Sequence, residues 1–249
     1  MIDIHTHTLP GIDDGSDSME TSLEMLSLSV ESGVDTVVTT PHCNIPRGCG
    51  NYASTELQIL WDRLNAERKK AGIPIRLCRG MEIFATEELP DLLTRRLVWT
   101  LNRTSYFLTE FSFDEDPDFC MRILQKCSDL GFRPIIAHPE RYYFVQDDPE
   151  IAYLWCTFGY GLQINKGSLL GSFGEREQEM ALALVDHGLA ACVASDAHTV
   201  EFRNTYMAEV ERLLTSEFGL EYATLLLDEN PSRILSGKAL VGYEPIPFR

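Results

Sequence analysis

Short apolar or β-branched runs alternate along the whole chain with longer stretches in which apolar residues recur at helical spacing. The runs predict strands over residues 1–5, 36–40, 75–83, 106–111, 134–137, 162–165 and 191–194. Several of them are continuously apolar, which is typical of strands that are covered on both faces. The pattern therefore predicts seven buried strands with helices between them.

Amphipathic stretches between these runs predict helices that end at glycine, the residue that most readily adopts the left-handed conformation after a helix. Met19, Leu23, Leu26 and Val30 form one apolar stripe that ends before Gly33. Comparable stretches end near Gly72, Gly131 and Gly188. Strands that alternate with helices lie parallel and are joined by right-handed crossovers, in a closed barrel or in an open doubly wound sheet.

The chain lacks the glycine-rich signatures of an open nucleotide-binding sheet. Neither a GxGxxG motif nor a P-loop follows the first predicted strand. No repeat, low-complexity tract or linker interrupts the 249 residues. We therefore expect a single α/β domain over residues 1–249.

Charge narrows the possible partners. The chain has 38 acidic and 21 basic residues, which give a net charge of −17, and such a surface repels nucleic acid and anionic membrane. The first residues lack the basic and apolar regions of a signal peptide, and no apolar run reaches the roughly 18 residues of a membrane span. The seven cysteines include no CxxC pair, so we expect reduced thiols, a cytoplasmic location and no membrane insertion.

Histidines and carboxylates gather at the ends of the predicted strands. Five of the six histidines lie at such an end or just beyond it: His5, His7, His42, His138 and His198. The carboxylates with the same placement are Glu82, Glu110 and Asp196, and the loop after the first strand adds Asp13 and Asp14. In a parallel barrel these strand ends meet on one face, where active sites are built.

A cluster of this kind indicates bound metal. Burying so many imidazoles and carboxylates is costly unless cations compensate their charge. Nitrogen and oxygen ligands without thiolate suit Zn, Mn or Fe, and their number exceeds what one ion requires, so a centre of two or three ions is predicted. We interpret His187 instead as the end of a helix, where a cation complements the dipole. Cys43 and Cys49 are interpreted as packed or exposed thiols.

Five motifs together resemble those of the PHP (polymerase and histidinol phosphatase) superfamily. They are Asp-Ile-His-Thr-His at 3–7, Thr-Pro-His at 40–42, Gly-Met-Glu at 80–82, His-Pro-Glu-Arg-Tyr at 138–142 and Ser-Asp-Ala-His at 195–198. Leu-Pro-Gly-Ile-Asp-Asp-Gly at 9–15 narrows the resemblance to the bacterial capsule and exopolysaccharide tyrosine phosphatases of the CpsB/YwqE type. The resemblance spans residues 1 to about 205. It implies a distorted (β/α)7 TIM-like barrel, the PHP fold, and a centre of three metal ions.

The resemblance also implies which residues bind each ion. The first ion takes His5, His7, Glu82 and Asp196. Glu82 bridges to a second ion, which is also bound by Glu110 and His138. The third ion takes His42, His198 and one aspartate of the loop, for which we favour Asp14 over Asp13, although spacing alone cannot separate these neighbours.

Two arginines match positions at which this branch of the superfamily holds the substrate phosphate. Arg141 and Arg203 carry the planar fork that suits phosphate oxygens. The alternative is a surface ion pair, of Arg141 with Glu140 and of Arg203 with Glu201. Lys166 departs from the small residue usual in the family, and we expect it either to contact substrate or to be solvated.

The resulting prediction is a metal-dependent phosphomonoester hydrolase that acts on phosphotyrosine in a protein, such as a bacterial tyrosine kinase of capsule or exopolysaccharide biosynthesis. Two or three divalent ions, Mn before Fe or Zn, lower the pKa of coordinated water toward about 7. A hydroxide held between two ions then attacks phosphorus, and His198 or a coordinated water protonates the leaving tyrosinate. The alternatives are a small-molecule phosphatase of the histidinol-phosphate type and a catalytically silent phosphotyrosine-binding or kinase-regulating module.

Overall fold

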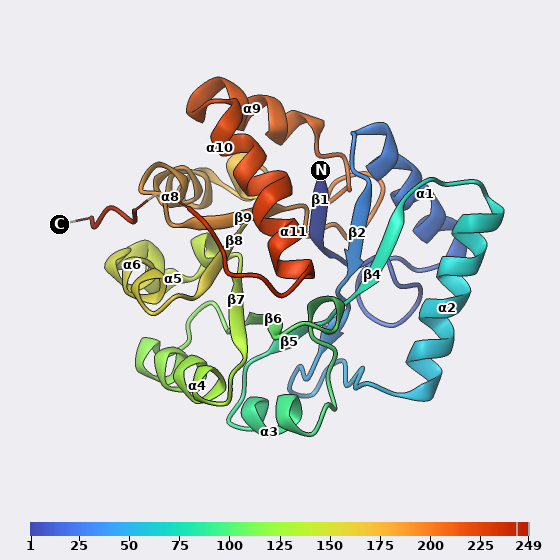
Figure 1. Cartoon of the computed structure of the whole chain (residues 1–249), viewed down its shortest axis with the longest axis horizontal. Coiled ribbons are helices and arrows are strands. Elements are labelled where there is room, and N and C mark those ends of the chain that lie inside the picture. Colours follow the sequence, from blue (N-terminus) through green and yellow to red (C-terminus); the bar gives the residue numbers. More distant parts are fainter. Residues whose placement is uncertain (243, 249) are drawn as a thin grey trace.

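A barrel of parallel strands forms the centre of the computed structural model, which describes residues 1–242 and 244–248 (Figure 1). Its strands are β1 Ile2–Thr6, β2 Thr36–Thr39, β3 His42–Cys43, β4 Arg76–Arg79, β5 Glu82–Phe84, β6 Tyr106–Glu110, β7 Arg133–Ala137, β8 Gly161–Asn165 and β9 Ala190–Ala194. They form two parallel sheets, in the orders β1-β2-β4 and β3-β5-β6-β7-β8-β9. A bridge from Thr6 to Ala197 joins β1 to the segment after β9. The predicted α/β barrel is confirmed.

The third predicted strand is divided into two short pieces, and a further short strand, β3, follows the second predicted strand; both features distort the barrel. The run expected at 75–83 is interrupted between β4 and β5 at Gly80. A side chain has no room there, because a Cβ at Gly80 would lie 2.8 Å from Leu101 Cδ2. His42 and Glu82 are the first residues of β3 and β5, and they are register partners in the sheet. The two side chains therefore lie next to each other at the carboxyl end of the barrel.

Helices surround the strands. They are α1 Met19–Glu31, α2 Thr55–Lys70, α3 Leu89–Thr94, α4 Pro117–Asp129, α5 Tyr143–Asp147, α6 Glu150–Thr157, α7 Lys166–Leu169 and α8 Glu175–Asp186. Side chains of Ser18, Ser54 and Asp116 accept hydrogen bonds from the first turns of α1, α2 and α4. The four glycines predicted to end helices each follow one and have positive φ angles, between 69° and 88°.

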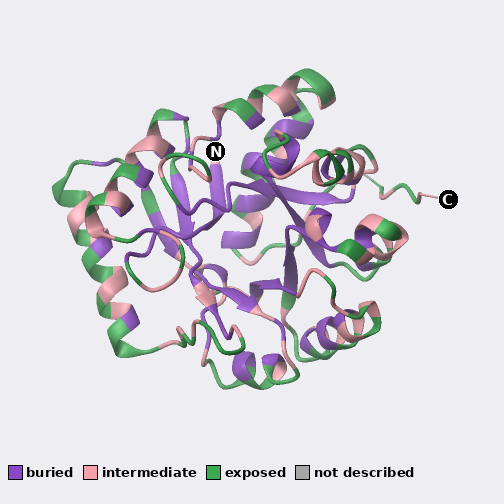
Figure 2. Cartoon of the chain, turned by 180° about the vertical axis from the view of Figure 1, so that it is seen from behind, coloured by how far each residue is buried: buried purple, intermediate pink, exposed green. Residues whose placement is uncertain are grey.

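The barrel interior holds a small apolar cluster, separate from the larger core between strands and helices. Figure 2 shows most of each strand buried, with exposed residues on the outer faces of the helices. Leu108 of β6 and Ala194 of β9 belong to the interior cluster. Because alternate residues of a strand share a face, Glu110 and Asp196, two residues further on, also face inward at the carboxyl ends.

The amino ends of the strands are covered by the C-terminal helices, for which the sequence pattern made no prediction. These are α9 Ala208–Phe218, α10 Leu220–Thr224, the π-helix Leu225–Glu229 and α11 Asn230–Leu235. Ile234 and Leu235 of α11 join the interior cluster, and Tyr106 at the start of β6 donates its hydroxyl hydrogen to the carbonyl of Lys238 at 2.8 Å. Of the two ends of the barrel, the carboxyl end is therefore the one left open for a site. No helix in the described part of the chain is long and apolar enough to cross a membrane.

Candidate metal centre

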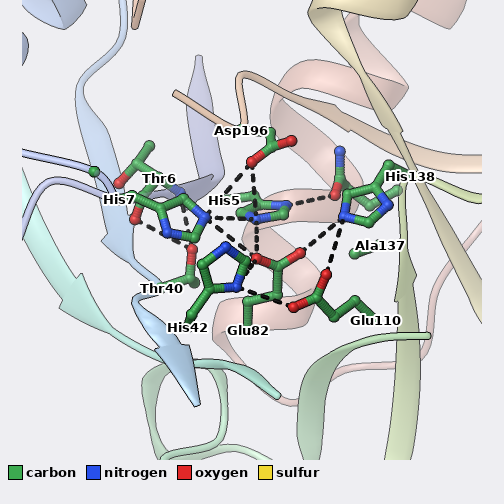
Figure 3. A network of polar contacts seen from close by, with 12 residues as sticks. His5, Thr6, His7, Thr40, His42, Glu82, Glu110, Ala137, His138 and Asp196 are labelled. Atoms are coloured by element: carbon green, nitrogen blue, oxygen red, sulfur yellow. Dashed lines mark hydrogen bonds and ion pairs between the residues drawn. The ribbon is translucent and has the colours of Figure 1, made fainter. Parts of the chain in front are cut away.

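Four buried residues converge at the carboxyl end of the barrel (Figure 3). His5 Nε2 lies 3.2 Å from Glu82 Oε2 and 3.4 Å from Asp196 Oδ1. His7 Nε2 lies 3.3 and 3.5 Å from the same two oxygens. The four ligand atoms all lie within 4.8 Å of one another. This is the group predicted for the first ion.

A second group forms around Glu110. His42 Nδ1 lies 3.0 Å from Glu82 Oε2 and 3.0 Å from Glu110 Oε1. His138 Nε2 lies 2.9 Å from Glu82 Oε1 and 3.9 Å from Glu110 Oε2. The structure therefore brings together the three residues predicted for the second ion. The Glu82 carboxylate touches both groups through its two oxygens, as a bridging ligand must.

The third predicted group lies nearest to solvent. Asp14 Oδ1 lies 3.4 Å from the Nε2 atoms of both His42 and His198, and His7 completes the cluster. The Asp14 side chain is 65% exposed, whereas Glu82 is fully buried. Asp14 therefore makes this group more accessible to solvent than the group around the buried Glu82.

Asp13 has a different role from its neighbour. Its Oδ2 accepts hydrogen bonds from His7 Nδ1 at 2.9 Å and from the His42 backbone N–H at 3.0 Å, and its Oδ1 accepts one from the Gly15 N–H at 3.0 Å. A carboxylate on the outer nitrogen of a histidine turns the other nitrogen toward a metal. This geometry favours Asp14 as the ligand and Asp13 as the residue that orients His7.

The donor set suits divalent cations. Glu82 Oε2, His42 Nδ1 and His198 Nε2 are buried atoms without a hydrogen-bond partner, although all three point into the cluster. Burial opposes ionisation of Glu82, yet the charges of His5 and His42 hold its pKa well below the usual range. Burial likewise opposes protonation of His42, but the carboxylates of Glu82 and Glu110 raise its pKa to about 10. Protons on the histidines thus neutralise the charge of the carboxylates, and bound Mn, Fe or Zn would take the place of these protons.

Two of the clustered residues have strained backbones. His138 and Asp196, each just beyond a strand, have φ angles of 37° and 50°, in the left-handed region that non-glycine residues rarely adopt. Such strain costs about 1–3 kcal/mol and persists where the surroundings fix the conformation. Here Asp196 N–H donates to the His5 carbonyl at 2.9 Å and His138 N–H to that of Gln163 at 2.8 Å. These bonds hold both side chains toward the centre.

The two predicted phosphate-binding arginines lie at the edge of this cluster. Arg203 Nη2 is 2.7 Å from Asp196 Oδ2, and Arg141 Nη1 is 3.6 Å from the same oxygen. Phe113 and Phe173 flank the Arg141 guanidinium, with ring centroids 4.7 and 4.8 Å from its Cζ. The two rings fix the plane of the guanidinium and leave its N–H groups free to donate hydrogen bonds.

The alternative surface ion pairs are wrong. Glu140 is fully buried and accepts hydrogen bonds from the Asn165 N–H at 3.0 Å and from Ser168 Oγ at 2.7 Å, so it is not available to Arg141. Arg203 pairs with Asp196 rather than with Glu201 within the described ranges. Both guanidiniums therefore belong to the site and not to the solvated surface.

Sequence and structure comparisons agree on the family. The family model for capsular polysaccharide synthesis, CpsB/CapC, matches residues 1–236. The chain belongs to the CpsB/CapC family. It is 35% identical over its full length to the tyrosine-protein phosphatase YwqE of Bacillus subtilis, covering 97% of that protein. It is 30% identical over 94% of its length to the tyrosine-protein phosphatase CpsB of Streptococcus pneumoniae, covering 98% of it.

Solved structures give the same assignment. A crystal structure of YwqE from Bacillus subtilis, reported with CpsB from Streptococcus pneumoniae as metal-dependent tyrosine phosphatases, superposes with a TM-score of 0.93 at 35% identity and covers 100% of both chains. A histidinol phosphate phosphatase from Lactococcus lactis superposes with a TM-score of 0.55 at 13% identity, covering 89% of this chain and 93% of that one. The second likeness concerns the fold alone, and it agrees with the PHP fold predicted for this CpsB/CapC-family chain.

Lys166 differs from both expectations. Its side chain is buried, and Nζ donates to the Asn204 carbonyl at 2.5 Å, to Asn204 Oδ1 at 2.9 Å and to the Tyr206 carbonyl at 3.2 Å. The ammonium has three hydrogens and three acceptors, so none is left for a substrate. Burial lowers the pKa of Lys166 to about 8. Lys166 anchors the segment that carries Arg203.

We expect Lys166→Met to lower kcat/KM for phosphotyrosine about tenfold without loss of metal, because partners that only orient a functional group contribute on this scale. In an Arg203→Ala variant the same substitution should lower kcat/KM little further, because both changes remove the contribution of Arg203. Steady-state kinetics with metal analysis check this, and Lys126→Met, at an exposed ion pair with Glu87, is the matched control. Full additivity of the two losses would contradict the anchoring role.

Sequence reasoning missed the residues that orient the predicted ligands. Gln163 Oε1 accepts from His5 Nδ1 at 2.7 Å, and Gln163 Nε2 donates to Asn165 Oδ1 at 2.8 Å. Asn165 Nδ2 in turn donates to Asp196 Oδ2 at 2.7 Å. A signal was present, because residues 163 and 165 are polar side chains at alternate positions of a predicted buried strand.

The residues interpreted as structural lie apart from the centre. His187 follows α8 as its C-cap, donates a hydrogen bond from Nδ1 to the Ile246 carbonyl at 3.0 Å, and stacks on Phe248 with the ring centroids 3.8 Å apart. Cys43 is packed in the core and Cys49 is half-buried. Neither thiol joins a group of candidate ligands within residues 1–242 and 244–248.

Proposed function

We propose that this chain is a metal-dependent protein-tyrosine phosphatase that hydrolyses phosphotyrosine in a protein target. One observation carries the proposal: the guanidiniums of Arg141 and Arg203 border a buried cluster of imidazoles and carboxylates, which they contact through Asp196. A guanidinium beside a metal centre is useful when an anion lies between them, and its fork suits phosphate. The tyrosine phosphatases YwqE and CpsB, to which the chain is similar over nearly its whole length, support the same reaction.

Three groups of residues are proposed to hold the ions. They are His5, His7, Glu82 and Asp196 for the first ion, Glu82, Glu110 and His138 for the second, and Asp14, His42 and His198 for the third. Divalent ions bound there, Mn before Fe or Zn, would supply an acidified water and neutralise phosphate charge. The chain itself contributes positioning and electrostatic stabilisation, which account for most of the catalysis of phosphoryl transfer.

His198 is better placed as a ligand than as the acid that protonates tyrosinate. Its Nδ1 donates a hydrogen bond to the Asp196 carbonyl oxygen at 3.0 Å. The other nitrogen, Nε2, which faces Asp14, therefore carries a lone pair that could bind a metal ion. Burial and the charge of His7 also lower the pKa of His198. We therefore propose His198 as a residue that would hold an ion and not as the donor of the proton to tyrosinate.

The aromatic rings beside Arg141 favour an aryl phosphate. Phe113 lies edge-to-face with Tyr143 at 6.3 Å, and Tyr143 is 50% exposed. A phosphate held by Arg141 brings its phenol ring next to this aromatic group, where edge-to-face contacts add about 0.5–1.5 kcal/mol. The imidazole of histidinol phosphate is joined to its phosphate by a flexible aliphatic chain, so it gains less binding energy from contact with these rings. The target is proposed to be a bacterial tyrosine kinase of capsule or exopolysaccharide biosynthesis, and the reaction is proposed to take place in the cytoplasm.

The deciding experiment compares phosphate release from three substrates by the Mn-loaded protein. We expect kcat/KM for a phosphotyrosine peptide to exceed that for the same peptide with phosphoserine, and that for histidinol phosphate, by at least about tenfold. A chelator should abolish release. Preference for histidinol phosphate would indicate the small-molecule alternative, and tight binding of the phosphotyrosine peptide without phosphate release would indicate a silent module.

A further inference from the structure

A second cavity lies on the side of the barrel. It has a volume of about 800 Å³, within the range of small-ligand pockets. Its lining comes from the end of α3, from the 3-10 turn Leu101–Arg103 with the residues on either side of it, and from the segment that follows α4. None of its lining residues is a candidate metal ligand. Its apolar wall consists of Ala53, Leu93, Val98, Trp99, Leu130 and Phe132.

The charged residues that line this cavity are all arginines. Arg79, Arg96 and Arg103 line it, and no carboxylate does. Such a lining is unexpected in a chain with 38 acidic and 21 basic residues. Arg96 and Arg103 are exposed and form no ion pair with any residue in the described part of the chain. Three guanidiniums that share a concave surface with no carboxylate in its lining repel one another, and a bound anion relieves that repulsion.

Arg79 is the fixed member of the three. Its guanidinium stacks over the Trp99 ring at 4.8 Å and donates a hydrogen bond to Gln58, while its buried Nε has no acceptor. Burial and the nearby charge of Arg103 lower the pKa of Arg79, and Asp62 is the acid that opposes them. Arg79 therefore keeps an unused donor beside a second positive charge.

The backbone also holds the other two arginines in place. Arg96, Asn102 and Arg103 have φ angles of 58°, 50° and 63°, and all three positions are unfavourable for residues with a Cβ. Strained positions of this kind cluster at ligand-binding sites, where the conformation itself is used. The Leu235 carbonyl fixes this turn by accepting a hydrogen bond from Asn102 Nδ2 at 2.9 Å.

We propose that this cavity binds a small phosphorylated ligand, with its phosphate among Arg79, Arg96 and Arg103 and its apolar body on the wall formed by Val98, Leu130 and Phe132. The donors match the oxygens of a phosphate dianion, and the enclosed volume fits a small molecule. A phosphate bound here is not hydrolysed, because no candidate ligand lines the cavity. This site is independent of the proposed phosphatase reaction.

Calorimetric titration of the Mn-loaded full chain with phenylphosphonate tests the proposal. This probe joins a dianion to an apolar ring and cannot be hydrolysed. We expect two binding sites in the wild type, one at the metal centre and one in the cavity. Arg96→Ala/Arg103→Ala should weaken the second site by at least about tenfold, because charge-assisted hydrogen bonds are lost, while phosphotyrosine turnover stays within about twofold of wild type.

The matched control is Arg76→Ala/Arg95→Ala, which removes the same charge from exposed positions of β4 and the end of α3 that do not line the cavity. This variant should keep both sites. A single site in the wild type, or two unchanged sites in Arg96→Ala/Arg103→Ala, would overturn the proposal. Equal weakening in both double variants would do the same, since it would show that net charge and not the cavity controls binding.

Discussion

Glu82→Gln is expected to lower kcat for phosphotyrosine at least about a thousandfold, beyond the 10- to 100-fold losses typical of residues that only orient a metal ligand. The reason is the central place of its carboxylate. Its Oε2 lies 3.2 Å from His5 Nε2 and 3.0 Å from His42 Nδ1, and its Oε1 lies 2.9 Å from His138 Nε2. A glutamine keeps one acceptor oxygen but places an NH₂ donor where a cation or an imidazole N–H requires an oxygen.

Glu110→Gln is the matched comparison, because Glu110 faces one group of ligands and its side chain is 12% exposed. We expect it to lose one equivalent of metal and part of the activity, whereas Glu82→Gln should lose at least two equivalents. Elemental analysis together with turnover distinguishes the two variants. Near-native turnover of Glu82→Gln, or equal losses in both variants, would rule out the bridging role of Glu82.

The strand pattern predicted the fold well because buried parallel strands leave a strong sequence signal. Each predicted run coincides with a strand to within two residues, apart from the run at 75–83. That run is divided because Gly80 packs against Leu101 from a distant turn, and no local propensity reports such a contact. The C-terminal helices were missed for a similar reason, since their packing under the barrel depends on tertiary contacts such as that of Tyr106 with the Lys238 carbonyl.

The candidate ligands were predictable as a set because the ends of parallel strands meet whatever the details of the loops. Residues within loops were less predictable. Asp13 and Asp14 have the same chemistry, and only the hydrogen bonds of Asp13 with His7 and the Gly15 N–H separate them. The role of Lys166 was not predictable either, because its acceptors, including the Tyr206 carbonyl, lie 38 to 40 positions away in the chain.

Arg203→Ala is expected to lower kcat/KM for phosphotyrosine about 10- to 150-fold, which corresponds to the 1.5–3 kcal/mol of a charge-assisted hydrogen bond. The guanidinium lies 2.7 Å from Asp196 Oδ2, while Asp196 Oδ1 faces His5. A phosphate bound beside the first group of ligands would therefore contact the Arg203 guanidinium. Arg203→Lys should recover only part of the loss, because a point charge cannot reproduce bidentate binding.

Metal content separates this role from a structural one. If Arg203 binds phosphate, Arg203→Ala keeps its full complement of metal and the competitive inhibition constant of inorganic phosphate rises along with KM. If it serves only to hold Asp196, the same variant loses metal, and added Mn restores its activity. Arg212→Ala is the control, because Arg212 is an exposed arginine of α9 whose one hydrogen bond within the described residues goes to the Ala208 carbonyl of its own helix. Turnover of metal-replete Arg203→Ala within twofold of wild type would exclude a contact with phosphate, because a guanidinium that binds the reacting group cannot be removed without cost.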